Sequence, residues 1–172
     1  MSLPRDPALL RILDGCTQAA NVAGSCLIVG LVVLIGADVL GRNLFAAPIS
    51  GVPEMVKLSI VAIVFLQAPQ ALKAGRMTRS DALIDRLNAR RPAVGGALET
   101  VFDLLAMGVV GAIFYATWPI FTRSWARGDF VGAVGDFTAP TWPVKLMILI
   151  GAALLTLQFA ARILRRYRRS AA

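Results

Sequence analysis

The sequence contains no histidine, only two cysteines and few charged residues. Without histidine it has no His-ligated haem, no His-containing metal site and no histidine base or catalytic triad. Cys16 and Cys26 lie ten positions apart in one predicted helix. A rise of about 1.5 Å per residue separates them by roughly 15 Å, too far for a disulfide. No Gly-rich phosphate loop and no nucleophile beside a base appears either, so we predict no enzyme activity and no cofactor in this chain.

Apolar residues dominate what remains. Of the 172 residues, 57% are hydrophobic and 16% charged, and the mean hydropathy is +0.69. These values are typical of an integral membrane protein. The net charge is +8, but the basic residues form short clusters beside apolar runs rather than one polar face. We therefore expect no nucleic-acid partner and interpret the basic clusters as signals that orient the chain in the membrane.

Four segments are long and apolar enough to span a membrane, which requires about 20 apolar residues each. We expect an all-α integral membrane protein, residues 1–172 forming a single membrane domain. The first apolar stretch, residues 15–37, is too long for a signal peptide, so we expect it to be retained as a membrane helix. No internal repeat is apparent. The expected helices cover about residues 16–40, 52–72, 98–122 and 142–161.

Basic residues are distributed unequally between the two sides of these spans. Thirteen of the 18 lie in the N-terminal tail, the loop between the second and third spans, and the C-terminal tail. Because basic loops stay in the cytoplasm, this bias predicts that both termini are cytoplasmic. Three tryptophans would then lie near the outer membrane interface, where amphipathic aromatics are common: Trp118, Trp125 and Trp142.

The loop between the second and third spans, LKAGRMTRSDALIDRL and its continuation, predicts a helix of its own. Ser80 is a suitable N-cap, Asp81 suits a helix N-terminus, and Pro92 marks a stop. The apolar residues between them share one helical face: Leu83, Ile84 and Leu87. We expect a short cytoplasmic amphipathic helix over about residues 81–91, which contacts either lipid or protein.

Charged pairs at helix ends are the remaining candidates for function. Asp38 and Arg42 are spaced to pair within one helix, which we favour over an ion or proton site. For Glu54 and Lys57, three apart, a mutual pair or a subunit contact is favoured over a substrate role. The basic run at residues 162–169 is interpreted as a stop-transfer signal rather than a lipid site. The candidate structural or subunit-contact residues are Asp38, Arg42, Glu54, Lys57, Arg79 and Asp81.

Polar and small residues inside the spans predict close helix packing rather than a site. Glutamines within apolar helices form interhelical hydrogen bonds, and glycines permit close approach of two helices. The residues concerned are Gln67, Gln70, Gln158, Gly24, Gly30, Gly108 and Gly111.

Several of these motifs occur in a familiar order. Residues 37–87 carry Arg42 after the first helix, Pro48-Ile49-Ser50-Gly51 with Glu54 at the second, and Arg79 with Asp81 after it. Residues 139–158 add a Trp-Pro entry and an early glycine. As a set they resemble the small membrane subunit (DctQ-type, or Q) of tripartite ATP-independent periplasmic (TRAP) transporters.

That resemblance implies a bacterial inner-membrane protein with four helices and both termini inside. Its partners would be a large membrane subunit, which binds and moves substrate with sodium, and a periplasmic protein that delivers the substrate, commonly an organic acid. The sodium gradient would be used by the large subunit, and this chain would act as a scaffold. Its charged helix ends, notably Arg42 and Glu54, would contact the large subunit or organise the loop that does.

Three alternatives remain open at this point. A self-sufficient four-helix transporter acting as a dimer would need a carboxylate deep in a helix, whereas Asp38, Glu54 and Asp103 lie toward helix ends. A membrane anchor of an electron-transfer enzyme conflicts with the absence of histidine. The small subunit of a tripartite tricarboxylate transporter has the same architecture and task.

Overall fold

The structure is a computed structural model that describes residues 7–76, 92–133 and 137–170, with side chains at all of these except 92, 93, 133, 169 and 170. Four of its helices are long and apolar enough to cross a membrane, as predicted. They are α1 (Ala8–Phe45), α2 (Val52–Lys73), α4 (Pro92–Arg127) and α5 (Trp142–Ser170). The amphipathic helix expected over residues 81–91 lies outside the described residues.

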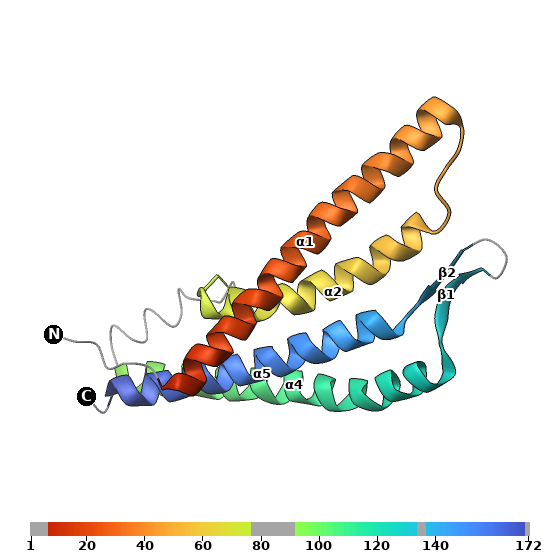
Figure 1. The fold of residues 1–172 in the computed structure, drawn as a ribbon. Coiled ribbons are helices and arrows are strands. Elements are labelled where there is room, and N and C mark those ends of the chain that lie inside the picture. Colours follow the sequence, from red (N-terminus) through yellow and green to blue (C-terminus); the bar gives the residue numbers. More distant parts are fainter. Residues whose placement is uncertain (1–6, 77–91, 134–136, 171–172) are drawn as a thin grey trace.

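The four helices alternate in direction, so the start of α1 and the end of α5 lie at the same end of the bundle (Figure 1). We call this the terminal end; it also holds the end of α2 and the start of α4. The opposite end, where α1 leads into α2 and α4 into α5, is the hairpin end. α5 packs against α4, α2 and α1, and is the central helix of the bundle.

Three helices extend beyond the spans expected from the sequence. α1 begins at Ala8 rather than near residue 16, α4 covers Pro92–Arg127 rather than 98–122, and α5 continues to Ser170 rather than 161. The expected spans were cut where charged residues begin, because charge is costly inside a membrane. A helix can continue past the hydrocarbon layer when its charged side chains find partners, and the added turns of α1 and α5 carry such partners.

A short β-hairpin that the sequence analysis did not anticipate joins α4 to α5. Strands β1 (Phe130–Ala133) and β2 (Phe137–Pro140) pair antiparallel, with Phe130 opposite Pro140 and Ala133 opposite Phe137. Gly132 has φ of 115°, a conformation that glycine adopts without strain. The hairpin therefore adds a small β element to the predicted all-α fold.

Residues 46–51 connect α1 to α2, and Gly51 at their end lies against Phe137 of the hairpin. Ala46 is left-handed, and Ala47 donates its N–H to the Gly41 carbonyl, which closes α1. Gly51, with φ of 81°, directly precedes α2, and a side chain there would overlap the ring of Phe137. The sequence Ser-Gly therefore supplies both a turn and the space for an aromatic ring from β2.

Helix packing is tight at some glycines and open at others. A Cβ on Gly151 of α5 would overlap the backbone of Phe65 in α2, and one on Gly24 of α1 would come within 2.9 Å of Gln67. Close approach is therefore confirmed for Gly24. It is not seen for the other three glycines that were expected to pack, because nothing lies within 4 Å of the corresponding position at Gly30, Gly108 or Gly111.

Candidate functional site

The ion pair expected between Asp38 and Arg42 is present at the hairpin end of α1. Arg42 Nη2 lies 2.9 Å from Asp38 Oδ2. The other carboxylate oxygen, Oδ1, accepts a hydrogen bond of 2.9 Å from the backbone N–H of Ile49. Asp38 is only 7% exposed, whereas the Arg42 side chain is 61% exposed. Asp38 thus fastens the loop before α2, and Arg42 presents its charge outward.

Glu54 and Lys57 lie in the first turns of α2, at the same end. Glu54 is half-buried and Lys57 is exposed. Within the part of the chain that the structure describes, the two side chains form no ion pair with each other, so their mutual pairing is not seen. The other two candidates, Arg79 and Asp81, fall outside the described residues.

A second polar group at the hairpin end joins α4 to α5. The Ser124 and Thr141 hydroxyls are buried and 2.9 Å apart, and Thr141 donates to the Asp129 carbonyl at 3.1 Å. Lys145 of α5 lies 3.5 Å from the Asp129 carboxylate. The Trp125 and Trp142 rings meet edge to face with centroids 4.6 Å apart. These contacts close the connection between α4 and α5 around the hairpin.

The terminal end holds a larger charged group, here called the terminal cluster. Its members come from all four helices: Asp14 (α1), Lys73 (α2), Glu99 and Asp103 (α4), and Arg162, Arg165 and Arg166 (α5). Asp14 binds two cations, Lys73 Nζ at 3.1 Å and Arg165 Nη2 at 3.0 Å. It therefore connects the first helix to the second and the last.

Asp103 occupies the most protected position in the terminal cluster. It is fully buried, and its Oδ2 lies 3.7 Å both from Arg162 Nε and from Arg166 Nη1. Arg166 also forms a close ion pair with Glu99 and donates to the Thr100 hydroxyl at 3.2 Å. Because a buried carboxylate needs nearby positive charge, the two arginines make the position of Asp103 possible.

Gln158 extends the terminal cluster into the bundle. It is buried, and its Nε2 donates to Thr17 Oγ1 at 2.9 Å and to Asp14 Oδ1 at 3.2 Å. Gln158 thus forms the interhelical hydrogen bonds expected of it. Thr17 is fully buried and in turn donates to the Leu13 carbonyl in its own helix. This hydrogen-bond chain fixes how α1 lies on α5.

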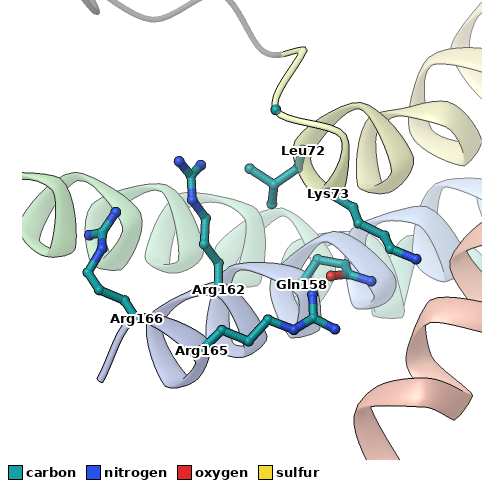
Figure 2. Close-up of a pocket in the computed structure, with 7 residues that line it drawn as sticks. Leu72, Lys73, Gln158, Arg162, Arg165 and Arg166 are labelled. Atoms are coloured by element: carbon teal, nitrogen blue, oxygen red, sulfur yellow. The ribbon is translucent and has the colours of Figure 1, made fainter. Parts of the chain in front are cut away.

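The terminal cluster lines a pocket of about 430 Å³. Arg165 places its guanidinium beside Gln158, and Lys73 of α2 extends in the same direction, toward α1 (Figure 2). Arg162 and Arg166 extend away from these two side chains (Figure 2). The walls are formed by Leu72, Lys73, Gly75, Gln158, Arg162, Arg165 and Arg166. Among the described residues no carboxylate lines the pocket, but each of its four cations contacts a carboxylate of the terminal cluster.

The sequence analysis did not identify the acidic half of this cluster. A usable signal was present in the spacing: Glu99 and Asp103 are four apart on α4, as are Arg162 and Arg166 on α5. Two stripes of opposite charge on antiparallel helices can face each other. Asp14 offered no such signal, because its partners are far away in sequence.

These arrangements can hold helices together. The described residues contain no group of acidic or thiol side chains able to hold a metal ion. A second pocket, of about 250 Å³, is almost wholly apolar and lies between α1, α2 and the start of α5. Much of the rest of α1 and α4 presents exposed aliphatic and aromatic side chains.

Comparison with protein families gives a match over residues 31–169 to the DctQ component of tripartite ATP-independent periplasmic transporters. The matched segment includes the loop fastened by Asp38 and most of the terminal cluster. Neither the comparison with curated proteins nor the comparison with solved structures gave a match.

Proposed function

Because the chain belongs to the DctQ component family of tripartite ATP-independent periplasmic transporters, we propose that it is the scaffold subunit for the large membrane subunit that moves the substrate. The single observation that carries this proposal is the family match over residues 31–169. As a membrane component of such a transporter, the chain holds its partner in place while the partner binds and carries the substrate.

The distribution of polar contacts supports a static role. The ion pairs of the described residues lie at the two ends of the bundle, where they connect helices or fasten a loop. Between the ends, α1 and α4 expose aliphatic and aromatic side chains, as a helix does when lipid or another protein covers it. A chain organised in this way adds membrane-embedded surface to its partner rather than a substrate path.

The hairpin end supplies charges for contact with the large subunit. Arg42 directs an exposed guanidinium outward, and Glu54 and Lys57 stand nearby in the first turns of α2. Asp38 bonds to the backbone of the loop before α2, which ties the start of α2 to the end of α1. Charged groups at an interface select the partner and its orientation more than they add affinity. Arg79 and Asp81 remain candidate contacts on sequence grounds.

The assembled system would take up an organic acid in symport with sodium, both bound by the large subunit, after delivery by a periplasmic binding protein. The chain would lie in a bacterial inner membrane with both termini in the cytoplasm. The basic residues at the terminal end support this orientation, since positive charge favours the cytoplasmic side. Lipid covers what the partner leaves exposed.

Purification from the native membrane tests this proposal. The tagged chain is extracted in mild detergent, and the large subunit is expected to copurify in a fixed ratio. Charge removal at Glu54 and Lys57 (E54Q with K57Q) is expected to reduce the copurified large subunit severalfold. The matched control, R123Q with R127Q, removes two charges from α4 at the same hairpin end. Recovery of the folded chain without any larger multi-span protein contradicts the proposal.

Two of the open alternatives have observations that weigh on them. A self-sufficient transporter would use a carboxylate deep in a helix to carry its ion or proton. The fully buried Asp103 lies beside Arg162 and Arg166, which favours a structural ion pair over a transport site. The family match favours the TRAP system over a tripartite tricarboxylate transporter. Proton-coupled flux in liposomes that contain only this chain would reverse the first preference.

A further inference from the structure

We propose that α1 has a fixed half and a movable half, and that the movable half closes over the apolar pocket between α1 and α2. The movable half, here called the arm, covers residues 25–45, which follow Gly24. The inference concerns this chain alone and does not rest on the proposed function. It assigns a role to the apolar pocket, which the proposed function leaves unused.

The half of α1 before the arm is held by close contacts. Its buried residues are Leu10, Thr17, Ala20 and Gly24. The Gln158 amide donates to Thr17 and to Asp14, which joins this half to α5. A Cβ on Gly24 would come within 2.9 Å of Gln67 on α2, so the two helices touch at this position. Gly24 therefore marks the end of the fixed half.

The arm is packed much less closely. The structure describes all of α1, and no residue between Gly24 and Asp38 is buried. A Cβ on Gly30 or Gly36 would meet no described atom within 4 Å. This half of α1 leans away from α2 and α5 (Figure 1). Elements with few buried apolar contacts are the ones that move within a folded protein, so the arm meets the physical condition for motion.

Side-chain size along one face of α1 explains why the arm diverges. Positions that alternate three and four residues apart share a helical face. In the fixed half this face carries Thr17, Ala20 and Gly24, whose small side chains permit close approach. In the arm the same face carries three half-buried leucines: Leu27, Leu31 and Leu34. The larger side chains keep α1 farther from α2 toward the hairpin end.

The space between the arm and α2 is the apolar pocket of about 250 Å³. The three leucines and Gly30 line it from α1, and Met55 and Leu58 line it from α2. Apolar side chains that face each other across a gap forfeit the dispersion contacts that close packing gives. Closure of the arm recovers these contacts, so the pocket itself supplies a driving force for the motion.

Two glycines define how the arm can move. Gly30 lines the pocket, and a glycine inside a helix lets the backbone change conformation more easily than other residues do. Asp38 accepts the N–H of Ile49, so the first part of the loop moves with α1. Ser50 and Gly51 then link this unit to α2, and Gly51 has φ of 81°. This short link limits further opening and permits closure.

Distances between spin labels test the proposal on the full-length chain in lipid nanodiscs. Both pairs share a label at the exposed Val64 of α2 (V64C). The test pair adds V33C on the arm, with C16S and C26S, and the reference pair uses the exposed Cys16 of the fixed half, with C26S. We expect the distance distribution of the test pair to be at least about twofold wider, because two arm positions contribute to it. Equal widths overturn the proposal, including when an acyl chain permanently fills the pocket.

Two matched glycine variants locate the motion in the pocket. Gly30→Leu places a side chain in the pocket, whereas Gly36→Leu adds the same side chain to the arm at a position that does not line it. Neither position has a described atom within 4 Å, so both variants are expected to fold. Gly30→Leu is expected to block closure and narrow the test-pair distribution about twofold, and Gly36→Leu to leave it unchanged. A Gly30→Leu variant without narrowing, or equal narrowing in both variants, overturns the assignment to the pocket.

Discussion

The two ends of this bundle are built in opposite ways. At the terminal end, side chains from all four helices meet in one charged cluster around a fully buried carboxylate. At the hairpin end, α1 leans away from the other helices (Figure 1), and the polar contacts form two separate groups, one in the loop before α2 and one between α4 and α5. The chain is thus fastened at one end and spread at the other.

This difference indicates a division of work. Distant parts of the sequence are held together at the terminal end, where the contacts need long-range partners to exist. At the hairpin end the contacts are mostly local, Arg42 and Lys57 are exposed, and Glu54 is half-buried. The scaffold role that we propose needs both properties, because a rigid base lets the spread end meet a partner in a defined geometry.

Removal of the buried carboxylate is expected to have the largest effect on stability. Asp103→Ala leaves Arg162 and Arg166 without the charge between them, although Arg166 keeps Glu99 and both arginines have some access to water. We expect a loss of about 3 kcal/mol in the free energy of unfolding, near the lower limit for breaking a buried pair. Thermal unfolding of the detergent-purified chain, followed by circular dichroism, measures it.

The control for the Asp103 change is a carboxylate at the hairpin end, Asp129. Asp129→Ala removes a 3.5 Å pair with Lys145 whose acidic side chain is 45% exposed, and a change below about 0.5 kcal/mol is expected. Equal losses at Asp103 and Asp129 would remove the distinction between the ends.

Close packing of α5 on α2 in the middle of the bundle is expected to give the second-largest effect on stability. Gly151→Ala places a methyl group against the backbone of Phe65 and pushes α5 from α2, at a cost of about 2 kcal/mol. In the control, Gly108→Ala, the new methyl group meets nothing within 4 Å. This change is expected to increase the free energy of unfolding by up to about 1 kcal/mol through helix propensity. Thermal unfolding distinguishes them, and a destabilised Gly108→Ala would show that α4 is covered at this position.

Two aspartates of α1 provide the finest comparison of the ends. Asp14→Asn weakens contacts with Lys73 and Arg165 on two other helices, whereas Asp38→Asn weakens a pair with the exposed Arg42 and one backbone hydrogen bond. We expect the Asp14 change to cost about 1 kcal/mol more. Urea titration of both variants in the same detergent provides the measurement. A larger loss at Asp38 would mean that the loop, not the terminal cluster, fixes α1.

Local signals in the sequence predicted part of this structure. The starts of α2 and α5 agree with the expected residues 52 and 142, and the Asp38 pair follows from helical spacing. The expected spans of α1, α4 and α5 were too short, because charged residues were taken as the limit of each helix. The bonds from Asp14 to Arg165 and Gln158 join residues 151 and 144 positions apart, so no local pattern could reveal them. The hairpin was missed because its strands are only four residues long.

The position of the arginines in α5 has a consequence for biosynthesis. Every carboxylate of the terminal cluster has an ion-pair partner on α5, the last of the four described helices along the chain. Domains form progressively as the ribosome adds residues, so three helices are complete before these charges exist. Asp14 can meet Lys73 early, but Glu99 and Asp103 find Arg166 only after α5 has been synthesised. Closure of the bundle therefore waits for synthesis of α5, and a chain that stopped before α5 would lack the arginines that contact Glu99 and Asp103.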